Sequence, residues 1–169
     1  NGKRLPVCKA VLHFNTKKDE EVLVKVGVSA VDIAGARKNV ESEIPKWDFD
    51  KVRKDARTAW NNYLSKIDIT TSDKEDKTIF YTALYHTAIS PNLFTDADGR
   101  YLGMDLEVHQ GDTINPLYTV FSLWDTFRAL HPLMTIIDPN LNNQFINSLI
   151  RKHQEGGIYP VSYTHLTLP

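Results

Sequence analysis

The spacing of the apolar residues changes near Asp32, and this change limits the fold more than any other feature of the sequence. In residues 20–31, valines at positions 22, 24, 26 and 28 recur at every second residue. After Asp32, apolar residues recur at every third or fourth position. Because a period of two is typical of strands and a period of 3.6 of helices, this order indicates a β-domain followed by an α-domain, neither of them complete.

The β part is expected to hold two strands. Residues 5–14 alternate in the manner of an extended segment, residues 20–31 repeat the signal, and the polar residues 15–19 between them are turn-like. Two neighbouring strands need a partner layer to bury their apolar faces. We therefore expect them to be the end of a larger β-domain. The chain begins with Asn1 rather than Met, which also suggests that its start is missing.

The α part is expected to form helices in series. Local signals mark their ends: Pro45 stops the first, Asp48 or Asp50 starts the second, and Asp138-Pro139 starts the last, which closes at Gly156-Gly157. The predicted helices cover residues 33–44, about 50–64, about 74–90, about 119–137 and 140 to about 154. Residues 92–116 are predicted to be a long irregular loop with a turn at 96–99, and a loop of this length that holds aromatic residues indicates function rather than disorder.

The last nine residues, 161–169, continue no pattern of the preceding chain. They closely resemble the translation of a transposon-type sequencing adapter. We interpret them as a non-native tail and exclude them from the prediction of the fold. A genuine surface strand with an abrupt end is the alternative.

Composition excludes several classes of function. The formal net charge is −1, so no basic surface points to nucleic acid as a partner. No apolar run approaches the ~20 residues that a membrane-spanning helix needs. The chain has a single cysteine, Cys8, so neither an internal disulfide nor a cysteine-based metal cluster is possible.

The most informative segment is the predicted helix over residues 119–137, where Asp125 interrupts an apolar stretch. Asp125 follows Trp124 and stands three residues before Arg128, so the two charged side chains share a helix face and can pair. An aromatic ring beside a charged pair suits a sugar, because the ring covers the apolar face of a pyranose while the charged groups bind its hydroxyls. The alternative is a buried ion pair between helices, which the residue types alone favour.

Other polar residues give weaker signals. The spacing of Asp96, Asp98 and Glu107 resembles a calcium-binding loop, but Arg100 occupies a ligand position, so solvated carboxylates in a turn are expected. Glycoside hydrolysis usually needs two carboxyl groups, and Asp125 alone cannot supply both. Glu155 is expected to be a helix-end surface residue. None of the histidines has metal-ligand spacing.

Residues 77–105, 118–139 and 153–160 resemble glycoside hydrolase family 92, a family of exo-acting α-mannosidases, and residues 24–31 and 44–67 resemble its domain junction. The resemblance implies a β + α multidomain fragment. Residues 1–31 would be the end of an N-terminal β-sandwich, 32–72 a helical linker, and 73–160 the first helices of an (α/α)6 barrel, followed by the 161–169 tail.

The resemblance also implies an inverting exo-α-mannosidase that removes terminal mannose from glycans outside the cytoplasm, with a bound calcium ion. In this family the catalytic acid, the base and most calcium ligands lie beyond the end of this chain, so the fragment is expected to be inactive. Trp124, Asp125 and Arg128 are the expected substrate-binding residues, followed by Asp96, Asp98 and Asp105. A non-catalytic carbohydrate-binding piece and another (α/α)6-barrel glycosidase are the alternatives.

Overall fold

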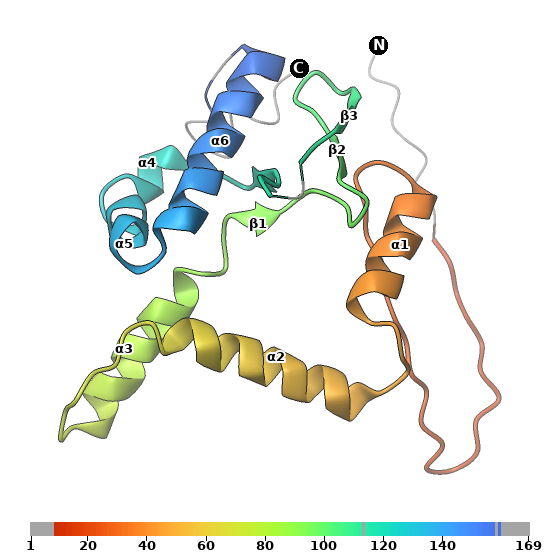
Figure 1. Ribbon diagram of the computed structural model, residues 1–169. Helices are drawn as coiled ribbons and strands as arrows, with labels where there is room; N and C mark the ends of the chain where they lie inside the picture. The colour runs from red at the N-terminus through yellow and green to blue at the C-terminus, as the bar shows by residue number, and fades with distance from the viewer. Residues whose placement is uncertain (1–8, 113, 158, 160–169) are drawn as a thin grey trace.

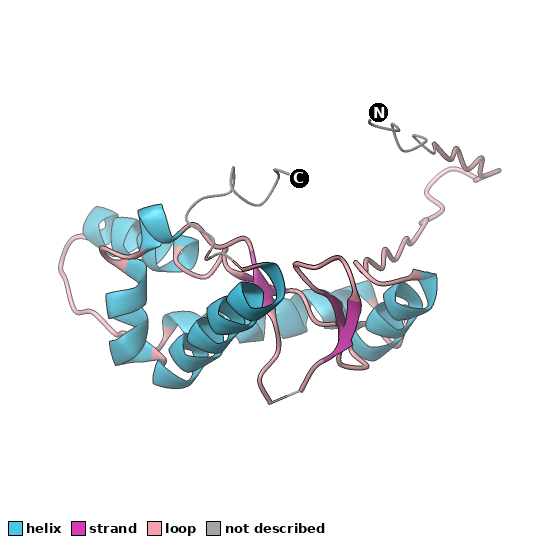
Figure 2. Cartoon of the chain, turned by 90° about the horizontal axis from the view of Figure 1, so that it is seen from above, coloured by secondary structure: helices cyan, strands magenta, loops and turns pink. Residues whose placement is uncertain are grey.

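A computed structural model describes residues 9–112, 114–157 and Tyr159 (Figure 1). Helices dominate the described part, and its strands are short (Figure 2). Residues 5–8, the cysteine at position 8 and the predicted tail lie outside the described residues. No helix among the described residues combines the length and the apolar content that a membrane span requires.

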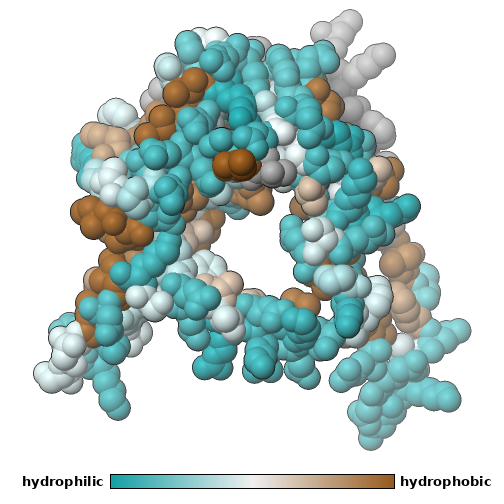
Figure 3. All heavy atoms as spheres, viewed as in Figure 1, coloured by the Kyte–Doolittle hydropathy of each residue, from teal (hydrophilic) through white to brown (hydrophobic). Residues whose placement is uncertain are grey.

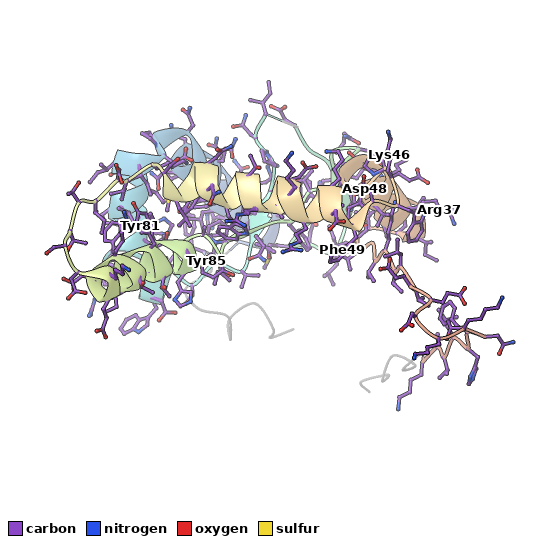
Figure 4. The ribbon with its side chains drawn as sticks, turned by 90° about the horizontal axis from the view of Figure 1, so that it is seen from below. Arg37, Lys46, Asp48, Phe49, Tyr81 and Tyr85 are labelled. Atoms are coloured by element: carbon purple, nitrogen blue, oxygen red, sulfur yellow. The ribbon has the colours of Figure 1, made fainter. Side chains whose placement is uncertain are left out.

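The first two helices confirm their predicted bounds. Helix α1 (Ile33–Glu43) begins after Asp32, whose carboxylate accepts a 2.6 Å hydrogen bond from the Gly35 amide. Helix α2 (Phe49–Leu64) begins after Asp48, which caps the amide of Lys51 in the same way. In Figure 4, Asp48 lies at one end of α2, and the labelled residue Tyr81 of α3 lies near the other end. Each carboxylate satisfies an amide that has no partner within its helix, which fixes where the helix starts.

Two later helices also start where the sequence indicated, although α3 ends at His86, four residues before its predicted end near residue 90. Helix α3 (Lys74–His86) follows the cap residue Asp73. Helix α6 (Pro139–Gly156) follows Asp138, which accepts a hydrogen bond from the Leu141 amide, and it ends at Gly157 with φ of 76°. A left-handed backbone of this kind strains any residue with a Cβ atom, so glycine is the natural residue at the end of α6.

The predicted strands are wrong for the part of the chain that the structure describes. Residues 9–31 are extended but pair with no strand, and only the turn at Lys18 and Asp19 is confirmed. The alternating valines are largely exposed, with Val26 at 76% and Val28 at 77% of their full surface. An extended segment becomes a strand only through a hydrogen-bonded neighbour, and no described residue supplies one.

The single helix predicted over residues 119–137 is also wrong. The structure divides this segment into strand β4 (Tyr118–Thr119), the short helix α4 (Leu123–Thr126) and helix α5 (Leu130–Ile137). Val120 adopts a φ of 63°, which no right-handed helix accommodates. Pro132 stands in the first turn of α5, where a missing amide hydrogen is tolerated, so it marks the start of a new helix rather than the interior of a long one.

Short strands interrupt the predicted loop over residues 92–116. Strand β1 (Asn92–Leu93) pairs antiparallel with β4, and β2 (Arg100–Leu102) pairs antiparallel with β3 (Val108–Gln110). The turn predicted at 96–99 is confirmed: the Gly99 amide donates to the Asp96 carbonyl, and Gly99 has a φ of 85°. Along the chain, the β2–β3 hairpin therefore lies between β1 and β4, which pair with each other.

The hydrophobic core lies beside α5 and α6. Phe121, Met134 and Phe145 form its buried centre, and the ring of Phe145 meets that of Phe121 edge-on at 5.8 Å. Helix α2, by contrast, buries no residue. It borders an opening through the molecule that the space-filling view shows plainly (Figure 3). The core therefore supports the segment around α4, while α2 is covered only toward its C-terminal end, where Tyr63 packs against the core and Trp60 contacts Tyr85 of α3.

Candidate functional site

Helix α4 carries the two residues that the sequence singled out most strongly. Phe121 and Ser122 precede it and are 1% and 2% exposed, so the start of α4 is fixed to the core. Trp124 follows with 69% of its surface exposed, and Asp125 is exposed beside it. A buried anchor followed directly by an exposed aromatic and a carboxylate holds both groups at the surface with a fixed backbone.

The carboxylate of Asp125 is held on one side. The Ser122 hydroxyl donates to Oδ2 of Asp125 at 2.5 Å. Within the described part of the chain, Oδ1 accepts no hydrogen bond. The two residues stand three apart, a spacing that resembles a helix capping box and that could have singled out Ser122 from sequence. One oxygen of Asp125 is therefore left for an external donor.

The predicted pair between Asp125 and Arg128 does not form. Pairing at a spacing of three requires a continuous helix, and α4 ends at Thr126. The guanidinium of Arg128 lies over the ring of Phe127 instead, 5.3 Å from its centre. Both charged groups are exposed, which also contradicts the buried ion pair that was the alternative. Each is free to contact a ligand separately.

A second set of polar contacts joins α4 to α5. The Thr126 hydroxyl donates to the Ser122 carbonyl and lies 3.0 Å from Nε2 of His131. Burial lowers the pKa of His131 below its usual value, and a hydrogen bond with Asn142 opposes that shift. His131 is therefore neutral near pH 7, and it joins α4 to α5 and α6 without adding charge.

Asp96 and Asp98 bind α1 and the segment before it. Asp96 is buried, and its carboxylate accepts hydrogen bonds from Ser29 at 2.6 Å and from the Asn39 amide at 2.7 Å. Asp98 pairs with Lys38 at 2.9 Å. The Lys38 ammonium and neighbouring donors lower the pKa of Asp98 to about 2. Asp96 is therefore not the solvated turn carboxylate expected from the sequence, because it ties the loop to α1.

Asp105 lies near the turn of the β2–β3 hairpin and pairs with His109. The closest contact joins Oδ2 of Asp105 to Nε2 of His109 at 2.9 Å. The hydrogen bond with Asp105 raises the pKa of His109, and the same contact lowers the pKa of Asp105. The imidazole of His109 also stacks on Tyr101 with ring centres 5.5 Å apart. The pair thus stiffens the hairpin, and it lies in a different segment from α4.

Glu155 is not the surface residue that the sequence suggested. It is half-buried near the end of α6, where it accepts a 2.7 Å hydrogen bond from the Tyr101 hydroxyl and a 3.1 Å bond from the Met104 amide. Burial and this hydrogen bond raise the pKa of Tyr101 to about 12. Sequence spacing gave no signal for this contact, because 54 residues separate the two side chains.

The calcium ion implied by the resemblance finds no fitting site in the described residues. A calcium site needs six to eight oxygen ligands. No group of three or more acidic, histidine or cysteine side chains among residues 9–112 and 114–157 is arranged to hold a metal. Asp96, Asp98 and Asp105 are each engaged by protein donors or cations. The described part of the chain therefore does not by itself hold this ion.

The structure resembles solved glycosidases. It superposes on an inverting family GH92 mannosidase from Bacteroides thetaiotaomicron VPI-5482 with a TM-score of 0.74 and 31% identity, over 80% of this chain and 19% of that one. A family GH92 α-mannosidase from Bacteroides thetaiotaomicron gives a TM-score of 0.71 and 36% identity, over 75% of this chain and 17% of that one. The same enzyme has been solved with mannoimidazole.

Sequence comparison agrees with the structural one. An uncharacterized secreted glycosidase of Arthroderma benhamiae is 35% identical in an alignment of 105 positions that covers 53% of this chain and 14% of the relative. The chain therefore spans less than a fifth of the length of the relatives it matches. The catalytic domain of glycosyl hydrolase family 92 matches residues 35–166. This match covers well over half of the chain and confirms the resemblance: the chain belongs to glycosyl hydrolase family 92.

Proposed function

We propose that the chain is part of a longer, inverting exo-α-mannosidase that removes terminal α-linked mannose from glycans. The observation that carries the proposal is the surface of α4, where Trp124 and Asp125 stand exposed on a backbone anchored by buried residues. The family match and the likeness to solved mannosidases give this surface its chemical context. The domain layout goes with the proposal: the end of a β-sandwich to residue 31, a linker over 32–72, and the start of an (α/α)6 barrel over 73–160.

Each residue of this surface matches one part of a pyranose. The indole of Trp124 offers a flat face to the C–H groups of the ring. The free oxygen of Asp125 accepts a hydrogen bond from a hydroxyl, and the guanidinium of Arg128 donates to hydroxyl oxygens. Because Asp125 and Arg128 are not paired with each other, no ion pair has to be broken when a sugar binds.

The proposal assigns proton transfer to other parts of the protein. Inverting glycosidases place the acid and the base on opposite sides of the scissile bond, about 6.5–9.5 Å apart. Several described carboxylates are already engaged: Asp96 by Ser29, Asp138 by Lys66, and Glu155 by Tyr101. We propose that the catalytic pair and most of the calcium ligands come from residues outside the described chain. The secreted relative supports a site of action outside the cytoplasm.

The test uses the full-length protein that contains this chain. It should hydrolyse an aryl α-mannoside and leave the matching aryl α-glucoside intact. Proton magnetic resonance of the early products should show the β-anomer of mannose first, because inversion reverses the configuration of an α-linked sugar. Removal of calcium by a chelator should reduce turnover, and added calcium should restore it.

The alternatives predict different outcomes. Hydrolysis of the glucoside but not the mannoside would contradict the mannosidase proposal. A full-length protein that binds mannosides but does not hydrolyse them would favour the hypothesis of a non-catalytic carbohydrate-binding protein. If α-mannose were the first product, only the inverting stereochemistry would be contradicted, and the proposed substrate class would stand.

A further inference from the structure

We propose that Ser122 is a positioning residue for sugar binding, which holds one oxygen of Asp125 so that the other is presented to a mannose hydroxyl. The inference rests on the proposed function, which assigns Asp125 to the substrate. It gives a role to the buried Ser122 hydroxyl beside that residue. Ser122 itself is 2% exposed, which leaves it almost no surface for direct contact with a sugar. Its effect on binding must therefore pass through Asp125.

The geometry makes this role specific. The hydroxyl of Ser122 donates to Oδ2 of Asp125 at 2.5 Å, and a hydrogen bond to an ionised acceptor is stronger than one between neutral groups. An exposed carboxylate on a short helix would otherwise rotate among several side-chain conformations. Fixing one oxygen selects one of them, so the ordering entropy is lost during folding rather than during sugar binding.

Helix capping does not account for the contact. In a capping box the serine hydroxyl would accept a hydrogen bond from a backbone amide of the first turn. Here no side-chain bond caps α4, and the Ser122 hydroxyl is directed at the carboxylate of Asp125. Only the carbonyl of Ser122 takes part in the hydrogen bonding of α4. It accepts hydrogen bonds from the amides of Asp125 and Thr126, both at 3.1 Å.

A second set of contacts keeps Ser122 in place. The Thr126 hydroxyl donates to the Ser122 carbonyl at 3.0 Å. Because that hydroxyl has one proton, its contact with Nε2 of His131 requires the imidazole to be the donor. The polar chain therefore runs from His131 on α5 through Thr126 to the backbone of Ser122. Phe121, beside it in the core, is 1% exposed, so the anchor has little freedom to move.

The test is a double-mutant cycle on the full-length protein, with the affinity for mannoimidazole measured by calorimetry. S122A should raise the dissociation constant about tenfold, which is the loss expected for one hydrogen bond to a charged group. D125A should raise it more. Adding S122A to D125A should have no further effect, because Ser122 would then have nothing to orient. S122T, which retains the hydroxyl, should restore most of the affinity lost in S122A.

The outcomes separate this inference from the proposed function. Failure of the proposed function would appear as no binding of mannoimidazole by the unsubstituted full-length protein, whereas unchanged affinity in D125A would overturn the assignment of Asp125 to the sugar and with it the basis of the inference. A loss of affinity in D125A with none in S122A would overturn the positioning role alone. An equal loss from S122A with and without Asp125 would also overturn it, because the serine would then act through the fold. Thermal melting of each variant identifies the last case directly.

Discussion

The phenol hydroxyl of Tyr101 donates a 2.7 Å hydrogen bond to the carboxylate of Glu155 and thereby joins the β2–β3 hairpin to the end of α6. The same carboxylate accepts the Met104 amide through its other oxygen. The guanidinium of Arg151 lies 5.4 Å from the Tyr101 ring centre. One glutamate therefore fixes the hairpin to α6 at two points, at the buried Tyr101 and at the Met104 amide.

Tyr101→Phe should loosen this junction. The variant keeps the buried ring and removes only the donor, so the carboxylate of Glu155 loses a partner that is worth about 1.5 kcal/mol or more. Hydrogen–deuterium exchange should become faster in residues 100–110. Tyr85→Phe is the matched control, because no hydrogen bond of the Tyr85 hydroxyl is present among the described residues and its ring is 39% exposed. Equal exchange in both variants would show that Glu155 does not hold the hairpin.

The Asp105–His109 pair should make the hairpin sensitive to pH. His109 has a raised pKa, so its stabilising contribution is complete below the ordinary value of 6.5 and is lost as the pH rises through the folded value. Asp105 has a lowered pKa, so its contribution is complete above 3.8 and is lost as the pH falls through the folded value. The pair is strongest between these limits. Asp105→Asn should lower the pKa of His109 toward 6.5 in a magnetic resonance titration, and an unchanged value would refute the pairing.

Gly35→Ala should lower stability although it lies in a helix. Alanine normally stabilises a helical position relative to glycine by roughly 0.5–1 kcal/mol. At Gly35 the added Cβ would lie 2.3 Å from Oδ2 of the buried Asp96, so we expect a net loss of about 1–3 kcal/mol in the free energy of unfolding. Denaturant unfolding measures it. In an Asp96→Ala background the same substitution should cost less, and an equal cost there would contradict the contact.

Helix bounds could be predicted from the sequence where the signal is local. Asp32, Asp48 and Asp138 cap the amides of residues three positions later, and Gly157 ends α6 through its own backbone, so each signal lies within the segment that it controls. The break in residues 119–137 was missed because strand β4 pairs with β1, which lies about 26 residues earlier. Pro132 was the available local sign of a new helix start.

The candidate site was partly predictable for the same reason. Trp124 and Asp125 stand out by residue type in an apolar segment, and the structure exposes both. The predicted pairing of Asp125 with Arg128 depended on a continuous helix and is wrong. The partners of Asp96 could not be read from spacing, because Ser29 and Asn39 lie 67 and 57 residues away along the chain.

The most direct test of the α4 surface is the turnover of an aryl α-mannoside by the full-length protein with Asp125 and Arg128 both replaced by alanine. Loss of two hydrogen-bonding groups that contact the sugar should reduce kcat/KM by at least about a hundredfold. Lys54→Ala, on the exposed surface of α2, is the control and should leave kcat/KM unchanged. Full mannoside turnover by the double variant would contradict the assignment of α4 to sugar binding.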